Sequence, residues 1–255
     1  MKIFKFGGAS VKDADSVKNV LRVLSIQGFE RCLIVVSAMG KTTNALERVV
    51  EFYFNKSNYQ QEIAKIKEEH IQIAKGLFDE NHHVFGEIKL FFDDIESFLR
   101  RNKSPNYNFV YDQVVTCGEM ISSKILSVYL SDNEMSNQWL DARDFIKTDT
   151  NYREGLVNWE ETEKNISQLD KTKTYVTQGF IGSDENNFTV SLGREGSDYS
   201  AAIFAYCLDA KDMTIWKDVP GVMTGDPRKF ENVELLSNIS YEEAIEMAYY
   251  GASVI

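Results

Sequence analysis

Residues 5–10, Lys-Phe-Gly-Gly-Ala-Ser, constrain the fold of this chain more than any other stretch. They close a short strand pattern at residues 2–6, and they precede residues 17–24, whose apolar side chains have the i, i+3, i+4, i+7 spacing of a helix. Adjacent glycines allow successive N–H groups to converge on an anion, and a helix that follows points its positive end at the same place. The stretch therefore predicts a phosphate-binding turn. A tight turn that simply needs glycine is the alternative.

The first half of the chain begins as a strand, a helix and a strand. After the strand at 2–6, a helix is predicted at 13–27 and a continuous apolar strand at 31–37, which is typical of a parallel strand covered on both faces. The second strand ends in the small residues 37–40, before another helix. Loops at the carboxyl ends of parallel strands meet at one edge of the sheet, so these two loops should lie together.

The middle of the chain has helical periodicity. Residues 59–101 predict two helices that form a hairpin broken near Asn81, with a solvated charged face and no chemistry. Residues 107–129 predict a helix interrupted at 116–119. Because glycine inside an apolar helix costs about 1 kcal/mol relative to alanine, Gly118 indicates a bend or a close approach there. Glu119 is then either a carboxylate at a kink or a cap of the following helix.

The C-terminal half alternates strands and helices. The predicted elements are a strand at 137–142, a helix at 158–169, a hairpin of strands at 175–181 and 188–192, a helix after the loop 193–198, a strand at 213–216, and a final helix started by the capping box Ser240-x-x-Glu243. Three glycine-bearing loops follow strands, at 7–8, 193–196 and 221–225. Each has a nearby cation, so the three loops together predict a site for a polyphosphate.

Composition excludes several classes of function. The chain has 255 residues, 28 Lys plus Arg and 39 Asp plus Glu, and its net charge of −11 is unfavourable for binding nucleic acid or an anionic membrane. It contains no 18-residue apolar run and no signal-peptide pattern, so we expect a cytoplasmic protein. Three prolines and no low-complexity linker favour one α/β domain.

The cysteines and histidines do not have the spacing of a metal site. Cys32, Cys117 and Cys207 lie in apolar segments, which predicts buried thiols rather than disulfides or zinc ligands. His70 and the pair at 82–83 have no partner at ligand spacing, so we expect surface histidines rather than metal ligands and assign no residue to a metal.

Five motifs, taken together, resemble those of the aspartate kinases, members of the amino-acid kinase superfamily. The motifs are Lys5-Phe6-Gly7-Gly8, Ser37-Ala38-Met39-Gly40, Gly118-Glu119, Gly193-Arg194-Glu195-Gly196-Ser197-Asp198, and Trp216-Lys217-Asp218-Val219-Pro220-Gly221 through Asp226-Pro227-Arg228. They occur in the order found in that family, and the resemblance extends from residue 2 to residue 253.

The resemblance implies a three-layer αβα sandwich with an open, mainly parallel eight-stranded sheet. Residues 1–255 would be a single catalytic domain, in which about 1–170 hold the amino acid and about 171–255 hold the nucleotide. The implied reaction transfers the γ-phosphoryl group of Mg-ATP to the side-chain carboxylate of L-aspartate. This is the first step of lysine, threonine and methionine biosynthesis.

The resemblance also implies roles for individual residues. Lys5 and Asp198 would be catalytic, the lysine on the phosphates and the aspartate keeping that lysine aligned. The residues implied to bind the amino acid are Ser37, Thr43, Glu119, Arg194 and Ser197. Those implied to bind ATP are Lys5, Gly7, Gly8, Ser10, Lys217, Asp218, Met223, Asp226 and Arg228.

The sequence departs from the family pattern near its end. Many members have lysine in a Gly-Ala-Lys-Val segment where this chain has Ser253, which removes one expected ATP contact. The chain also ends before the regulatory domains that bind lysine or threonine in many relatives and that would make the full-length protein a homodimer. Two alternatives stay open: a sister kinase acting on glutamate, acetylglutamate, carbamate or UMP, and a non-catalytic nucleotide-binding module.

Overall fold

The computed structural model of the chain describes residues 1–252. They divide into two compact units, which are described separately: residues 1–216, and the segment that begins at Lys217. The first unit contains the sheet and most of the helices.

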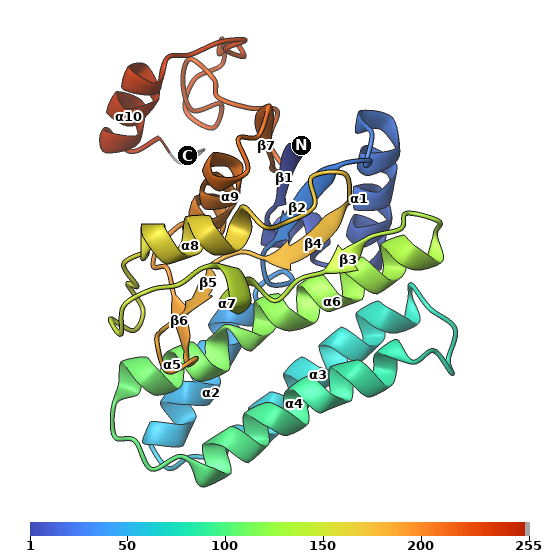
Figure 1. The fold of residues 1–255 in the computed structure, drawn as a ribbon, viewed down its shortest axis with the longest axis vertical. Coiled ribbons are helices and arrows are strands. Elements are labelled where there is room, and N and C mark those ends of the chain that lie inside the picture. Colours follow the sequence, from blue (N-terminus) through green and yellow to red (C-terminus); the bar gives the residue numbers. More distant parts are fainter. Residues whose placement is uncertain (253–255) are drawn as a thin grey trace. The chain divides into compact units, whose positions relative to one another are not determined.

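The first unit is built on a parallel sheet (Figure 1). Its five strands run in the order β3-β4-β2-β1-β7, and every neighbouring pair is parallel. The strands are β1 (Lys2–Phe6), β2 (Cys32–Val36), β3 (Gln138–Trp139), β4 (Tyr175–Gln178) and β7 (Asp212–Trp216). Because the strand order reverses on either side of β1, the loops at the carboxyl ends diverge there and leave a crevice.

Helices cover both faces of this sheet. The helices of the first unit are the 3-10 helix η1 (Gly8–Val11), α1 (Ala14–Gln27), α2 (Thr42–Phe54), α3 (Tyr59–Lys75), α4 (Val84–Arg101), α5 (Tyr107–Val115), α6 (Cys117–Asp132), α7 (Ala142–Phe145), α8 (Trp159–Ile166) and α9 (Gly196–Cys207). In β1, Phe4 and Phe6 join the core formed with α1 to α6, whereas Ile3 joins a second core formed with α8 and α9. This alternation follows from the two-residue period of a strand and gives three layers.

The sheet differs in two ways from the one expected. The described residues form five parallel strands, rather than eight strands in one sheet, together with a separate antiparallel pair, β5 (Ile181–Ser183) and β6 (Thr189–Ser191). Of the hairpin expected from strands at 175–181 and 188–192, only the part around the turn forms, where β5 pairs with β6. The extended conformation is interrupted at Phe180, whose φ of 73° is incompatible with a continuing strand. As a result, β4 joins the parallel sheet and β5 does not.

The predicted helical region agrees with the structure, apart from one histidine. Helices α3 and α4 pack together, with residues 76–83 between them, and α5 ends where α6 begins. His70, however, is only 1 % exposed rather than on the surface. It lies on the apolar face of α3 with Ile66, whose carbonyl is 2.7 Å from its Nδ1, and burial lowers the pKa of the ring.

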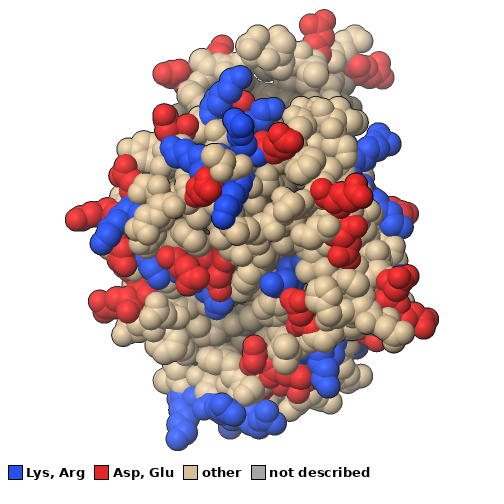
Figure 2. All heavy atoms as spheres, turned by 45° about the vertical axis from the view of Figure 1, so that its right-hand side comes forward, with Lys and Arg blue, Asp and Glu red and all other residues tan. Residues whose placement is uncertain are grey.

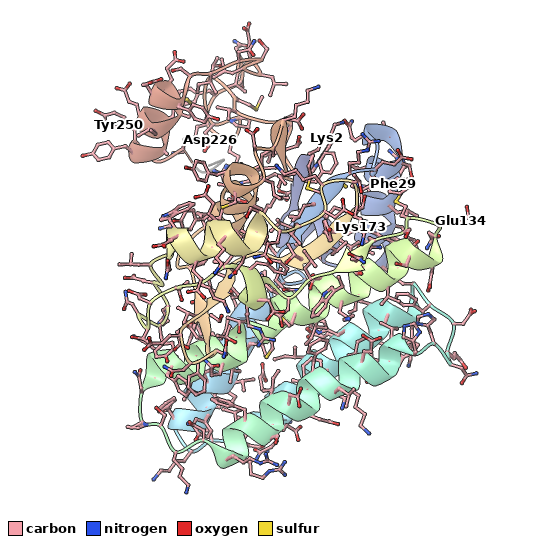
Figure 3. All side chains as sticks on the ribbon, viewed as in Figure 1. Lys2, Phe29, Glu134, Lys173, Asp226 and Tyr250 are labelled. Atoms are coloured by element: carbon pink, nitrogen blue, oxygen red, sulfur yellow. The ribbon has the colours of Figure 1, made fainter. Side chains whose placement is uncertain are left out.

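At the amino ends of the strands, short connections hold β2 and β4 in register. The Thr174 hydroxyl donates to the carbonyl of Phe29 at 2.6 Å, just ahead of the two strands. Phe29, Lys173 and Lys2 mark this end of the sheet in Figure 3. The loops at the opposite, carboxyl ends carry the motifs that the sequence singles out.

The second unit contains one helix, α10 (Tyr241–Tyr249), within its described residues. The predicted capping box is present: the Ser240 hydroxyl accepts from the Glu243 N–H, and the Glu243 carboxylate accepts from the Ser240 N–H. No residue of α10 is buried, and Tyr250, labelled in Figure 3, is 79 % exposed.

The three cysteines are free thiols; Cys32 and Cys207 are buried, as expected, whereas Cys117 is half-buried. Burial raises the pKa of Cys32 and of Cys207 to about 11 and that of Cys117 to about 12. Within residues 1–252, no group of three His, Cys, Asp or Glu side chains is arranged to hold a metal ion. None of the helices described is long and apolar enough to cross a membrane.

Candidate active site

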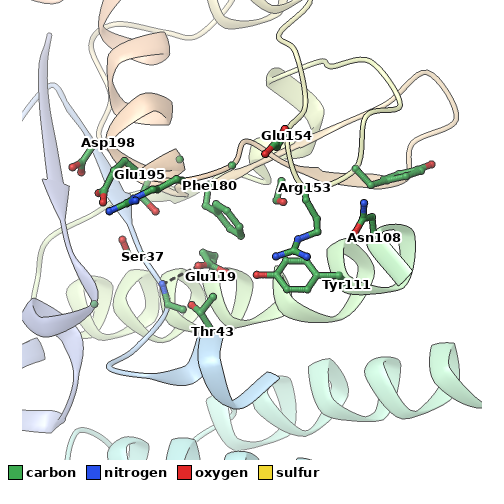
Figure 4. A pocket seen from close by; sticks show the side chains of 18 of the residues that line it. Ser37, Thr43, Asn108, Tyr111, Glu119, Arg153, Glu154, Phe180, Glu195 and Asp198 are labelled. Atoms are coloured by element: carbon green, nitrogen blue, oxygen red, sulfur yellow. Dashed lines mark hydrogen bonds between the residues drawn. The ribbon is translucent and has the colours of Figure 1, made fainter. Parts of the chain in front are cut away.

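A cavity of about 800 Å³ lies where the loops after β1, β2 and β4 meet the start of α9. Figure 4 shows part of its lining. The lining residues that the sequence had predicted are Lys5, Gly8, Ser37, Thr43, Glu119, Arg194, Ser197 and Asp198. Residues from four separate parts of the first unit, at 5–8, 37–43, 119 and 194–198, therefore meet in one cavity.

Lys5 and Asp198 form an ion pair in this cavity. The alternation along β1 places Lys5 on the same face of the sheet as Ile3, toward α9, and the first turn of α9 carries Asp198. The Lys5 Nζ lies 2.6 Å from the Asp198 Oδ1, and the two side chains are 8 % and 17 % exposed. A cation that is otherwise costly to bury is thus held at the carboxyl end of the central strand.

The glycine turn after β1 packs directly on the turn after β2. A Cβ on Gly8 would lie 2.8 Å from the Ala38 carbonyl oxygen and 3.1 Å from that of Gly40, and the Gly40 N–H donates to the Gly8 carbonyl at 3.0 Å. Gly40 itself has a φ of 54°. Gly8 is therefore needed for the close approach of the two backbones, whereas Gly7 has an ordinary φ of −74° and room for a Cβ.

Glu119 is a buried acid at the floor of the cavity. It lies in the first turn of α6 and is 3 % exposed. The Ala38 N–H donates weakly to its Oε1 at 3.4 Å, and its Oε2 has no hydrogen-bond partner among the residues described. Burial raises the pKa of Glu119 to about 8, so the carboxyl is largely protonated at neutral pH without a ligand.

Helix α6 also fixes the residues beside Glu119. A Cβ on Gly118 would lie 3.0 Å from the Ala38 Cβ and 3.1 Å from the Thr42 Cγ2, which confirms the predicted close approach. The Ser122 hydroxyl donates to the Ser37 carbonyl at 2.7 Å. The break between α5 and α6 thus brings a carboxyl group and the turn after β2 together.

The loop that begins α9 supplies Arg194 and Ser197. Arg194 is exposed, and its guanidinium makes no hydrogen bond or ion pair in the described part of the chain. Ser197 packs closely against Gly179, the residue that follows β4: a Cβ on Gly179 would lie 2.6 Å from the Ser197 Cβ. The first turn of α9 therefore lies at the cavity, although the N–H groups of Gly196 and Asp198 already donate to the carbonyls of Gly193 and Glu195.

The remaining predicted residues lie elsewhere. Gly7 and Ser10 belong to the turn after β1 but do not line the cavity, and the Ser10 N–H donates to the Gly7 carbonyl at 2.9 Å. The second unit carries Lys217, Asp218, Met223, Asp226 and Arg228. There Arg228 donates two hydrogen bonds of 3.0 Å to the Asp226 carboxylate, which lowers the pKa of Asp226. Ser253 lies outside the described residues.

The sequence analysis missed one side of the cavity. Asn108, Tyr111, Tyr152, Arg153, Phe180 and Glu195 also line it. A signal for Arg153 was present, because Arg-Glu-Gly occurs twice in the chain, at 153–155 and at 194–196. Only the second copy follows a predicted strand, so only the second was assigned to the site.

Comparison with known proteins assigns the chain to a family. Residues 1–255 match the profile of the Amino acid kinase family, and the chain belongs to that family. It is 32 % identical over 267 residues to the bifunctional aspartokinase/homoserine dehydrogenase 2 of Arabidopsis thaliana, covering 99 % of this chain and 29 % of that protein. It is 30 % identical over 264 residues to the lysine-sensitive aspartokinase 3 of Escherichia coli, covering 99 % of this chain and 57 % of that protein.

The fold gives the same relationship. The crystal structure of E. coli aspartokinase III in complex with aspartate and ADP matches with a TM-score of 0.87 and 28 % sequence identity, over 100 % of this chain and 57 % of that chain. This chain therefore spans less than a third of the length of the bifunctional relative and somewhat over half of the length of the monofunctional one.

Proposed function

We propose that this chain transfers the γ-phosphoryl group of Mg-ATP to the side-chain carboxylate of L-aspartate, giving 4-phospho-L-aspartate. The observation that carries the proposal is the meeting of Lys5, Asp198, Arg194 and Glu119 in one cavity beside a glycine turn. Lys5 is complementary to a phosphate, Arg194 to a carboxylate and Glu119 to an ammonium group. The names of the relatives, which are aspartokinases, support the same acceptor.

Transfer to a carboxylate needs alignment and charge neutralisation more than proton transfer. The acceptor is already ionised at neutral pH, so no general base is required. Lys5 neutralises charge that develops on the transferred group, and Asp198 holds the ammonium of Lys5 at 2.6 Å so that it does not turn away. The pair is nearly excluded from solvent, which strengthens its effect on a bound phosphate.

The residues present fit a triphosphate. Lys5 and the exposed Arg194 supply positive charge to the cavity, and the positive end of the α9 dipole lies at its edge. Because Mg²⁺ is usually bound by one or two carboxylates together with substrate phosphates, the lack of a preformed cage of side chains does not conflict with Mg-ATP. Held together with the phosphates beside Lys5 and Asp198, the metal would neutralise part of the phosphate charge.

For the amino acid, the cavity offers groups of both signs. Arg194 can hold a carboxylate with two parallel hydrogen bonds. The Oε2 of Glu119, which has no partner in the described residues, can accept from the substrate ammonium. Ser37, Thr43 and Ser197 line the same cavity and offer hydroxyl groups to the substrate or to phosphate.

We infer the remaining assignments from the same relationship. Residues of about 1–170 hold the amino acid, and residues of about 171–255 hold the nucleotide, with Lys217, Asp218, Met223, Asp226 and Arg228 on the ATP. The product enters lysine, threonine and methionine biosynthesis. The full-length protein is a cytoplasmic homodimer. Gel filtration at several protein concentrations tests the dimer.

The decisive experiment measures ADP release with Mg-ATP and a panel of acceptors: L-aspartate, L-glutamate, N-acetyl-L-glutamate, carbamate and UMP. Trapping with hydroxylamine is run in parallel, because an acyl phosphate gives a hydroxamate and phosphorylated UMP does not. We expect ADP release and hydroxamate with L-aspartate, and little of either with the other acceptors.

Two results would contradict the proposal. Turnover of another acceptor in preference to aspartate would identify a sister kinase. Tight binding of Mg-ATP in calorimetry, with no ADP release for any acceptor, would identify a non-catalytic nucleotide-binding module.

A further inference from the structure

Arg194 lies on a tight turn at the edge of the cavity. Its neighbours Gly193 and Glu195 both have left-handed backbone conformations, with φ of 78° and 55°. A positive φ is unfavourable for glutamate, and such strain persists only where the surrounding structure enforces it. The Arg194 side chain makes no hydrogen bond or ion pair in the part of the chain described, so the backbone beneath it decides where its guanidinium enters the cavity.

A buried carboxylate holds the segment that leads into this turn. Asp112, on α5, is fully buried. Its Oδ2 accepts from the N–H of Ser191 at 2.9 Å, and its Oδ1 accepts from the hydroxyl of Ser191 at 2.6 Å. Ser191 ends β6 and lines the cavity, three residues before Arg194. Because a buried carboxylate is costly unless its hydrogen bonds are made, these contacts hold the end of β6 firmly on α5.

The same carboxylate holds the segment against which the turn packs. The Oδ2 of Asp112 also accepts from the Arg153 N–H at 2.8 Å. A Cβ on Gly193 would lie 3.4 Å from the Arg153 carbonyl oxygen, so the turn is in direct contact with this segment. The Gly155 N–H donates to the Ser191 carbonyl at 2.9 Å and joins the two segments to each other. Asp112 therefore fixes the turn of Arg194 from two directions.

We propose that Asp112 is a positioning residue for Arg194, and that it fixes the turn from which Arg194 binds the carboxylate of the amino acid that is not phosphorylated. The inference rests on the proposed function. The carboxylate that attacks must keep its oxygen lone pairs free for the triphosphate, so the two-pronged contact of Arg194 falls to the other carboxylate. A two-pronged contact has a fixed geometry, and displacement of the turn would lengthen at least one of its hydrogen bonds.

Gln113, the next residue of α5, provides a matched control. Its side-chain amide donates to the Thr189 carbonyl at 2.8 Å and accepts from the Thr189 N–H at 3.1 Å. Gln113 thus holds the same strand from the same helix, but at the start of β6 rather than at its end, and it does not line the cavity. A comparison of the two residues separates support of β6 in general from support of the turn that carries Arg194.

The first test compares Asp112→Ala with Gln113→Ala in steady-state kinetics and urea unfolding. For Asp112→Ala we expect the aspartate KM to rise about tenfold or more, as for the loss of one charge-assisted hydrogen bond, with kcat and the ATP KM changed much less. Gln113→Ala should lower the free energy of unfolding and leave the aspartate KM unchanged. Asp112→Asn should retain most of the affinity, because its amide oxygen can accept from both N–H groups while its NH₂ donates to the Ser191 hydroxyl oxygen.

The second test asks whether Asp112 acts through Arg194. The Arg194→Lys variant lacks the two-pronged contact from the start. Adding Asp112→Ala to it should therefore lower kcat/KM for aspartate by a much smaller factor than Asp112→Ala does in the wild type. If Asp112→Ala fails to fold, Ser191→Ala takes its place in both tests, because it removes only the hydrogen bond of 2.6 Å, and it should raise the aspartate KM by a smaller factor.

Three results would overturn the inference while leaving the proposed function intact. One is an aspartate KM that is unchanged in Asp112→Ala, or in Ser191→Ala where that variant is used. Another is an equal rise in KM for Gln113→Ala, which would show that any loosening of β6 has the same effect. The third is an equal loss of kcat/KM with and without Arg194→Lys, which would show that Asp112 acts independently of Arg194. A wild-type chain that phosphorylates no acceptor would instead contradict the proposed function.

Discussion

At the scale of single residues, the site combines one preformed ion pair with one acid that lacks a partner. Lys5 and Asp198 contact each other without any ligand, whereas the Oε2 of Glu119 is buried among the described residues without a hydrogen bond. An unsatisfied buried polar atom costs about 1–3 kcal/mol, so a ligand that donates to Glu119 gains from relieving it. The two arrangements make different predictions.

Lys5→Ala should nearly abolish turnover with little loss of stability. Removing a charge aimed at the transferred group costs on the order of 10²–10³-fold in kcat. The remaining Asp198 side chain is 17 % exposed, so water can solvate it. Lys2→Ala in the same strand, whose amine donates to the Gln27 carbonyl away from the cavity, is the control. Steady-state kinetics and urea unfolding measure the two effects, and near-normal turnover would show that Lys5 is not catalytic.

Because of Glu119, the free energy of unfolding should fall as pH rises. Its pKa is raised from the ordinary value, near 4.5, to about 8 in the folded protein, so between these values the folded state binds the proton and the unfolded state does not. This contribution is fully present below pH 4.5 and is lost as pH rises through 8, by at most about 1.4 kcal/mol per pH unit. Glu119→Gln should remove that slope in urea unfolding between pH 5 and pH 8.

The control for Glu119 is Glu62, a buried acid whose pKa is lowered rather than raised. Hydrogen bonds from Arg48 and Lys65 lower the pKa of Glu62, so its contribution is lost only as pH falls through acidic values. Between pH 5 and pH 8 the difference between wild type and Glu62→Gln should be flat. An equally flat difference for Glu119→Gln would show that Glu119 is already ionised in the folded protein.

At the scale of elements, much was predictable from local pattern. The continuous apolar run of β2, the helical spacing of α3 and α4 and the capping box of α10 each depend on neighbouring residues, and each is confirmed. His70 was also within reach, because it continues the buried face of Ile63 and Ile66. The division of β4 from β5 was not, because it depends on Gly179 packing against Ser197 from α9.

For the site too, local sequence pattern predicted only some of the residues. Residues 5–8 and 193–198 lie in motifs at strand ends, and the structure brings both into one cavity. Arg153 lies in the loop between α7 and α8, and its N–H is held by the Asp112 carboxylate in α5. The repeated Arg-Glu-Gly was a local signal for this residue, but its place in the cavity depends on contacts between distant parts of the chain, which leave no local pattern.

Gly8→Ala tests the packing between the two turns. Its Cβ would meet backbone oxygens at 2.8 and 3.1 Å, so the turns must separate. We expect a loss of about 1–3 kcal/mol in the free energy of unfolding, together with a large rise in the KM for ATP. Gly86→Ala is the control, because nothing lies within 4 Å of its Cβ in α4, and it should stabilise by about 0.5–1 kcal/mol. A normal KM for ATP in Gly8→Ala would separate this turn from nucleotide binding.

At the scale of the whole molecule, the two units differ in how much they bury. The first unit contains extensive cores on both faces of its sheet, whereas α10 buries no residue. Charge is spread rather than concentrated: on the face drawn in Figure 2, acidic and basic side chains are interspersed. On that face the negative charge is not gathered into one patch, and the cations of the cavity, Lys5 and Arg194, can attract an anion locally.

Hydrogen exchange should distinguish the two units. Amides of β1 and β2 should exchange slowly, because their strands lie between two cores, and amides of 217–252 should exchange quickly. Since we propose that the second unit binds nucleotide, Mg-ATP should slow exchange in residues 217–228, whereas aspartate alone should not. Exchange measured by mass spectrometry tests this, and protection confined to the first unit would place the nucleotide site elsewhere.

The buried carboxylate of Asp112 also limits how such a chain can change over evolutionary time. Asp112, in α5, accepts hydrogen bonds from the N–H of Arg153 and from the N–H of Ser191 at the end of β6. A substitution of Asp112 therefore disturbs both segments, whereas a substitution in either segment disturbs only that one. We would expect descendants that lose this acid to have acquired a compensating donor or acceptor at Ser191 or in the turn that follows β6. Divergence at position 112 should accordingly come in matched steps, in which the acid and the groups that bond to it change together.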